Sequence, residues 1–280
     1  MFRRCANRSE SFTVLLLATM SCSLVVALTG CGGASETRGA QAHAPSTAGS
    51  TYTLLQMNLC LSGYGGCNGK AEYPDSVEEA VARIRATRPD AVTLNETCRG
   101  DVVRIARRTA YHVRFTRVIY AGELLPCVRP GGRGLFGNAV LTAAAVERTD
   151  SRDFAAQAGP ERRRWLCVGT RAGVDVCTAH LNTVSAVESP ANAPQCAEVG
   201  ALIARRAARR IVIFGGDLNR RGSCAPAGAW TRTDRSAHQA GGLQHVYGSR
   251  ALRGPSAQVL PATHTDHDFL LVRARLAERR

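Results

Sequence analysis

Two apolar segments with polar clusters at their ends constrain the fold of this chain most strongly. Residues 211–214 (IVIF) run directly into 215–219 (GGDLN), and about fifty residues later 265–268 (TDHD) precede a further apolar segment. Short apolar segments of this kind are typical of buried β-strands. The pair therefore predicts two carboxylates, an amide and an imidazole at the ends of neighbouring strands. Carboxylate and amide oxygens suit a hard cation such as Mg²⁺, and imidazole can move protons near neutral pH.

The remaining apolar patterns predict an α/β layered sandwich in one domain over residues 51–280, because many strands alternate with few helices. Asp75 or Ser76 is the expected N-cap of the first helix, and Pro89 ends it. The predicted strands are 51–58, 91–94, 138–145, 165–168, 174–179, 211–214, 243–247 and 269–272, and the predicted helices are 75–88, 102–110 and 195–210.

The N-terminal residues have the pattern of a targeting segment. Three arginines among the first eight residues precede an apolar stretch at 13–27, and 28–31 (LTGC) resembles a bacterial lipobox in which Cys31 carries the lipid. An uncleaved membrane anchor and a simple secreted signal are the alternatives, and all three export the protein. The expected division is a lipoprotein signal peptide at 1–30, a flexible Gly/Ser/Thr/Ala-rich tether at 31–50, and the folded domain at 51–280.

Eleven cysteines indicate disulfides once export is assumed. Two of them leave with the signal peptide and Cys31 carries lipid, so an even number remains in an oxidising compartment. A zinc site is disfavoured because no CxxC pair occurs. Local spacing favours Cys60–Cys67 and Cys167–Cys177, and Cys98–Cys127 and Cys196–Cys224 follow by elimination.

The net charge of +14 is carried almost entirely by arginine, with Lys70 the single lysine. Arginine runs at 162–164, 205–206 and 209–210 are compatible with a polyanion such as nucleic acid or anionic lipid. A solvated helix face explains such runs equally well, so charge alone selects no partner.

Seven polar residues end the predicted strands in a fixed order: Asn58, Glu96, His180, Asp217, Asn219, Asp266 and His267. This order resembles the endonuclease/exonuclease/phosphatase superfamily over about residues 52–276. The sharpest motifs are 216–219 (GDLN) and 265–267 (TDH), the second standing where that family usually has Ser-Asp-His. The resemblance implies a deoxyribonuclease I-like four-layer α/β sandwich, in which helices flank two packed, mainly antiparallel β-sheets, and it implies a metal-dependent phosphoesterase.

The resemblance also implies a metal site at Asn58, Glu96 and Asp266. Mg²⁺ is the expected ion, with Mn²⁺ or Ca²⁺ as alternatives. A turn residue is the alternative interpretation of Asn58, and a surface carboxylate or helix cap that of Glu96.

By the same resemblance, four further residues are catalytic. His180 would bind the phosphate, Asp217 would orient or deprotonate the attacking water, and Asn219 would bind the phosphoryl oxygens. His267 would contact the phosphate or share in proton transfer.

Two further residues are expected near the cleft. Residues 132–142 resemble the family's Gly-Asn-Ala strand, which places Asn138 there. Gln244 stands where many members carry an Asp that supports the final histidine. It can orient His267 but cannot stabilise the protonated imidazole as a carboxylate does. Asp234 from a nearby loop is the alternative support.

The sequence thus predicts an exported Mg²⁺-dependent phosphodiesterase, with nucleic acid as the first substrate class. A phospholipid, sphingomyelin or small-phosphoester hydrolase is the alternative, for which residues 121–130 offer an apolar loop. A catalytically inactive surface binding protein of the same fold is the second alternative. The expected protein is a monomer tethered to the cell envelope through Cys31.

Overall fold

The computed structural model describes residues 49–277 except 68 and 188. The predicted signal peptide, Cys31 and most of the predicted tether lie outside the described residues. In the part of the chain that the structure describes, no helix is both long enough and apolar enough to cross a membrane.

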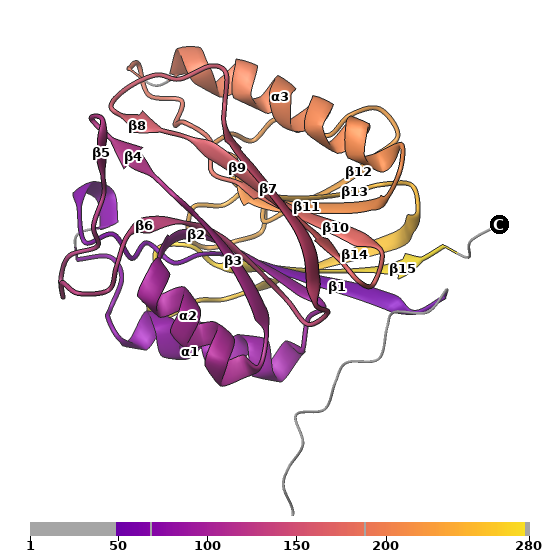
Figure 1. The fold of residues 1–280 in the computed structure, drawn as a ribbon, viewed down its shortest axis with the longest axis horizontal. Coiled ribbons are helices and arrows are strands. Elements are labelled where there is room, and N and C mark those ends of the chain that lie inside the picture. Colours follow the sequence, from indigo (N-terminus) through magenta and orange to yellow (C-terminus); the bar gives the residue numbers. More distant parts are fainter. Residues whose placement is uncertain (1–48, 68, 188, 278–280) are drawn as a thin grey trace, which may run out of the picture. The chain divides into compact units, whose positions relative to one another are not determined.

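Two six-stranded sheets form the centre of the domain (Figure 1). The first sheet has the order β14 (Leu252–Leu260), β15 (Phe269–Leu276), β1 (Thr51–Asn58), β2 (Ala91–Cys98), β6 (Phe136–Thr142), β3 (His112–Arg117). The second has the order β12 (Trp230–Thr233), β13 (Gln244–Gly248), β11 (Ile211–Asp217), β10 (Val174–Ala179), β9 (Arg164–Thr170), β7 (Val146–Asp153). Pairing is antiparallel except for β1 with β2 and β10 with β11, which are parallel.

Helices cover the outer face of each sheet. α1 (Asp75–Thr87) and α2 (Arg99–Thr109) pack on the first sheet, and α3 (Ser189–Ala207) packs on the second (Figure 1). A small third sheet joins β5 (Glu123–Leu124), β4 (Ile119–Tyr120) and β8 (Glu161–Arg162), and a single 3₁₀ turn, η1, spans Gly65–Cys67. The predicted four-layer α/β sandwich is confirmed.

Three apolar layers hold the sandwich together, because both faces of the central strands are buried. In β1, Leu54 packs between the two sheets, and Leu55 packs against the helices with Ile84 of α1. In β11, Ile213 joins the layer between the sheets, while Phe214 packs under α3. Strand side chains alternate between faces, so a strand buried on both sides needs the continuous apolar sequence that these strands have.

The helix boundaries differ from the prediction at their N-terminal ends. α2 begins three residues early, and Pro74 occupies the N-cap of α1 in place of Asp75 or Ser76. α3 begins at Ser189 although Pro194 lies inside it. Buried hydrogen bonds compensate for this proline: the amide of Asn192 donates to the carbonyls of Asn182 and Leu218 at 2.5 and 3.0 Å. Tertiary contacts therefore extend the helix past the point where local propensity would end it.

All four predicted disulfides are present: Cys60–Cys67, Cys98–Cys127, Cys167–Cys177 and Cys196–Cys224. Cys167 and Cys177 lie directly opposite each other on the antiparallel strands β9 and β10, as the predicted hairpin requires.

Candidate active site

The predicted residues converge where two parallel strand pairs end, one pair in each sheet. Parallel strands end at the same edge of a sheet, so β1 and β2 bring Asn58 and Glu96 together. In the second sheet, Asp217 ends β11, and His180 follows β10 and forms a bridge to Asp217. The site therefore lies between the two sheets at their shared edge.

Asp217 is the centre of the hydrogen-bond network. Asn58 Nδ2 donates to Glu96 Oε1 at 2.9 Å and to Asp217 Oδ2 at 3.0 Å. Asp217 Oδ2 also lies 3.2 Å from Nε2 of His267. Asp217 Oδ1 accepts the backbone N–H of Asn219 at 2.9 Å, across a turn in which Asn219 has a φ of 49°. Three other predicted residues thus contact this buried carboxylate, and Glu96 is joined to it through Asn58.

His267 lies between two carboxylates. Its Nδ1 is 2.8 Å from Asp266 Oδ1, and its Nε2 contacts Asp217. Burial by itself would lower the pKa of His267, but these two contacts raise it to about 10. Burial would also raise the pKa of Asp217, but the hydrogen bond from His267 holds it well below its usual range. At neutral pH an imidazolium therefore stands beside an ionised Asp217.

His180 is held as a neutral imidazole by a partner that the sequence analysis missed. Nη1 of the buried Arg163 lies 2.8 Å from His180 Nδ1. A guanidinium only donates, so Nδ1 accepts this hydrogen bond. Burial, with Arg163 adding to it, lowers the pKa of His180 to about 3. The amide nitrogen of Asn219 donates to Leu181 O at 2.9 Å and also lies 2.9 Å from His180 Nε2, so Arg163 and Asn219 hold the two ring nitrogens of His180.

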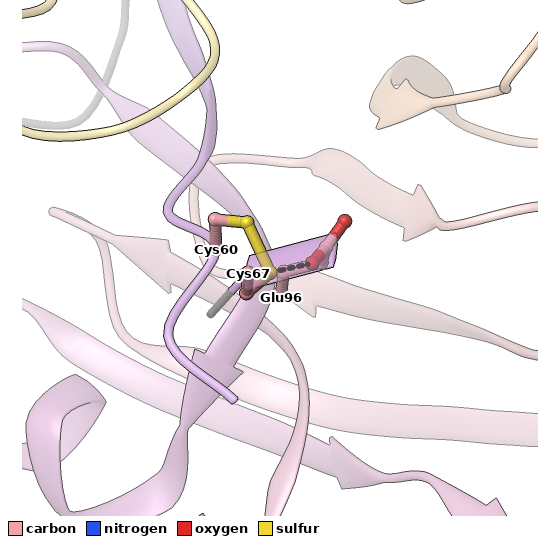
Figure 2. A group of neighbouring side chains, drawn as sticks. All are labelled: Cys60, Cys67 and Glu96. Carbon is pink, nitrogen blue, oxygen red and sulfur yellow. Dashed lines mark hydrogen bonds between the residues drawn. A yellow bond between two sulfur atoms is a disulfide. The ribbon is translucent and has the colours of Figure 1, made fainter. Parts of the chain in front are cut away.

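Glu96 carries the carboxylate best suited to a cation. It sits at an irregularity of the β2–β6 pairing with a φ of 51°. Its Oε2 lies 2.7 Å from Sγ of Cys67, which belongs to a disulfide and has no hydrogen to donate (Figure 2). Burial raises the pKa of Glu96 to about 7, although the hydrogen bond from the neutral Asn58 side chain acts to lower it. Among the described residues, no hydrogen-bond donor contacts Oε2, which leaves this oxygen available to a cation.

The donor set includes a group of three residues that lie close enough to hold a hard divalent ion. Glu96, His180 and Asp217 offer atoms within 4.8 Å of one another. The Oδ1 of Asn58 instead accepts the backbone N–H of Cys60 at 3.1 Å, so this amide positions the two carboxylates. The carboxylate of Asp266 is held by His267 and by Lys70 Nζ at 3.5 Å. Glu96 and Asp217 are thus the two carboxylates that lie close enough together to share one ion, and the expected set of Asn58, Glu96 and Asp266 stays a prediction.

Asn95 is a second residue that the sequence analysis missed, and it ties the two sheets together. Its Oδ1 accepts the backbone N–H of Asp217 and the Nε2 of Gln56, each at 2.8 Å. Its Nδ2 donates to Asn138 Oδ1 at 3.0 Å and to Ala179 O at 3.2 Å. Asn138 is therefore buried behind the site rather than in the cleft. An amide inside an apolar strand, immediately before Glu96, was the available sequence signal.

The interpretation of Gln244 as the residue that orients His267 is wrong. Gln244 is fully buried and donates to Asp234 Oδ2 at 3.2 Å and to the backbone carbonyl of Asp268. Asp234 in turn accepts the backbone N–H groups of Gly242 and Gln244, so it does not support His267 either. Asp217 and Asp266 supply that support.

A cavity of about 580 Å³ opens onto the network. Glu96, Arg163, His180 and Asp266 line its polar side. Four apolar or aromatic residues also line it, Tyr64, Tyr120, Leu125 and Phe136, and the disulfide loop adds Cys60, Ser62, Gly65, Gly66 and Cys67.

Comparisons with known proteins show the family and the fold of this chain. Residues 60–267 match the Endonuclease/Exonuclease/phosphatase family. A search of curated proteins gives no match.

Three solved structures illustrate the likeness of fold. An endonuclease/exonuclease/phosphatase from Beutenbergia cavernae is 19% identical, with a TM-score of 0.60 over 81% of this chain and 72% of that chain. D. rerio TDP2, complexed with a single-strand DNA product, is 14% identical, with a TM-score of 0.59 over 81% of this chain and 99% of that chain. The human Nocturnin catalytic domain, with a bound sulfate, is 13% identical, with a TM-score of 0.59 over 81% of this chain and 95% of that chain.

Proposed function

Because the chain belongs to the endonuclease/exonuclease/phosphatase family, whose members are phosphoesterase hydrolases, we propose that it hydrolyses phosphodiester bonds in nucleic acid with the help of Mg²⁺. The observation that carries the proposal is the buried network around Asp217, in which Glu96 keeps one oxygen without a donor. The single-strand DNA product bound to D. rerio TDP2 supports nucleic acid as the substrate class.

Enzymes of this superfamily typically depend on a divalent metal ion. Glu96 and Asp217 would hold it here, where it would neutralise charge on the phosphoryl oxygens and on the leaving group. Mn²⁺ is an alternative ion with the same oxygen preference.

Four side chains of the protein have separate roles in the proposed hydrolysis. His180 and the guanidinium of Arg163 line the cavity and stabilise the charge that develops on the phosphoryl group. Asp217 is ionised but weakly basic because His267 donates to it, so it orients the attacking water more than it deprotonates it. His267 is protonated at neutral pH and has a proton to give to the leaving oxygen.

We also propose that the protein works outside the cytoplasm, with a lipid on Cys31 as its tether. The four disulfides of the folded domain support an oxidising compartment. Globomycin, which blocks processing of lipoprotein signal peptides, should cause the precursor to accumulate, whereas a Cys31→Ser protein should be released from the membrane fraction.

A nicking assay tests the function. Purified protein and supercoiled plasmid DNA are incubated with Mg²⁺, with EDTA, and with an Asp217→Asn variant as the matched control. Nicking that needs Mg²⁺ and is lost in the variant supports the proposal. Nicking that survives in the variant would point to a contaminant. If neither the plasmid nor a labelled single strand is cut, the substrate assignment fails, and release of phosphocholine or inorganic phosphate identifies the alternative hydrolase.

A further inference from the structure

The cavity beside the phosphate-binding groups has an aromatic wall. Among the described residues, the exposed large apolar or aromatic side chains are Tyr64, Tyr120, Leu124, Val184 and Val187. The only two aromatic ones in that set, Tyr64 at 43% and Tyr120 at 45% exposure, both line this cavity. Aromatic residues make up only 5% of the sequence, so their exposure at one place calls for a function.

Tyr64 is presented by a loop that is fastened at several points. The Cys60–Cys67 disulfide closes the loop, and Cys67 N–H donates to Tyr64 O at 3.0 Å. The carbonyl of Ser62 accepts the backbone N–H of Val128 at 3.0 Å, which fixes the loop to the neighbouring segment. Because the loop backbone that carries the Tyr64 ring is held in this way, it loses little conformational freedom when a ligand packs on the ring.

Tyr120 is joined to the phosphate-facing side of the site by the small sheet. In that sheet Tyr120 pairs with Glu161 of β8, and β8 leads directly to Arg163. Leu125 and Phe136 complete the wall, and the carbonyl of Leu125 accepts the backbone N–H of Phe136 at 2.8 Å. The aromatic wall and the phosphate-facing guanidinium are therefore fixed relative to one another.

We propose that this aromatic wall is a subsite for an unpaired nucleobase next to the scissile phosphate, so that the enzyme acts on single-stranded or frayed nucleic acid; this rests on the proposed function. The cavity has the size of a small-ligand pocket. Aromatic side chains bind bases by stacking whatever the sequence, since every base has a π-face. A base inside a duplex is already paired and stacked and must leave the helix before it can enter a pocket.

Paired tyrosine variants separate stacking from simple apolar contact. Tyr64→Leu with Tyr120→Leu keeps apolar bulk and removes the rings, whereas Tyr64→Phe with Tyr120→Phe keeps the rings. Leu124→Ala, an exposed neighbour that does not line the cavity, is the surface control. Each protein is assayed with Mg²⁺ on a labelled single strand, on the same strand in a duplex, and on a strand of equal length built from abasic residues. Thermal unfolding checks that each variant is folded.

For the single strand, kcat/KM of the leucine variant should fall about 5- to 150-fold, the range that stacking of one base supplies, while the phenylalanine and Leu124 variants keep the wild-type value. The wild-type protein should cut the abasic strand and the duplex as poorly as the leucine variant cuts the single strand. Equal rates of the leucine variant and the wild type on the single strand, or equal wild-type rates on normal and abasic strands, overturn the subsite and leave the nuclease function standing. A wild-type protein that cuts none of these strands, whether or not it releases phosphocholine from phosphatidylcholine vesicles, overturns the proposed function and the subsite with it.

Discussion

Lowering the pH from 8 to 6 should weaken Mg²⁺ binding about 10-fold, because a proton and the cation compete for Glu96. Burial raises the pKa of this carboxyl to about 7. About nine-tenths of it is ionised at pH 8 and about one-tenth at pH 6, so the apparent affinity for the cation falls by about the same ratio. The sign follows from the direction of the shift: a carboxyl with a raised pKa keeps its proton up to a higher pH.

The other charged groups of the network either titrate outside the range from pH 6 to pH 8 or lie away from the cavity. His267 titrates at about 10 and His180 at about 3, while the pKa of Asp217 lies well below its usual range. Asp234, whose pKa burial raises to about 6, bonds to Gln244 behind the site and does not line the cavity. Glu96 is therefore the group that should set the pH dependence of metal binding.

Isothermal titration of the protein with Mg²⁺ at pH 6, 7 and 8, in buffers of different ionisation enthalpy, measures both the affinity and the protons released. About half a proton should leave per ion bound at pH 7. A Glu96→Gln variant should bind the ion weakly, with an affinity that no longer changes over this range. Affinity of the wild-type protein that is constant from pH 6 to 8, or that changes only near pH 4.5, would refute the assignment of Glu96 as a desolvated metal ligand.

Four other substitutions or treatments test the remaining parts of the site. Asp217→Asn should lower kcat about 10²- to 10⁴-fold in a single-turnover cleavage assay while the melting temperature stays close to wild type. Arg163→Gln should lower kcat about 10²- to 10³-fold, with partial recovery in Arg163→Lys, because the phosphoryl group loses a charged donor. Reduction by a dithiol, or replacement of Cys60 and Cys67 by serine, should cost about 2–3 kcal/mol of unfolding free energy in urea titrations and should raise the Mg²⁺ concentration needed for cleavage. Gly215→Ala should cost about 1–3 kcal/mol in the same titrations, because its Cβ would lie 2.4 Å from Thr93 Oγ1.

The sequence allowed the inner strands of the fold to be predicted but not the outer ones. The eight predicted strands correspond to the eight inner strands of the two six-stranded sheets. The four edge strands of these two sheets, β14, β3, β12 and β7, were not predicted. β7 shows the reason: it reads VERTDSRD, and none of its residues is fully buried. An edge strand that faces water needs no apolar run, so its pairing is decided by the neighbouring strand rather than by its own sequence.

The candidate site likewise contains residues that could be predicted from the sequence and one that could not. Seven residues could be found because each ends an apolar strand and their order matches a family. Arg163 could not, because it is the middle residue of a run of three arginines whose neighbours point elsewhere: Arg162 is exposed and Arg164 pairs with Asp153. Only the path of the chain from β8 into β9 decides which of the three guanidinium groups reaches His180.

The disulfide beside Glu96 links the redox state of the protein to the charge of its metal ligand. A backbone or hydroxyl donor at this position would hold Glu96 equally well, but it would lower the pKa of the carboxyl and share its negative charge. The Cys67 sulfur, oxidised, touches Oε2 without donating, so the oxygen keeps its full charge for a cation (Figure 2). Reduction would place a thiol hydrogen at the same contact and give Oε2 the donor that it now lacks. The oxidising compartment that we propose for this protein would therefore also keep Glu96 free to bind a cation.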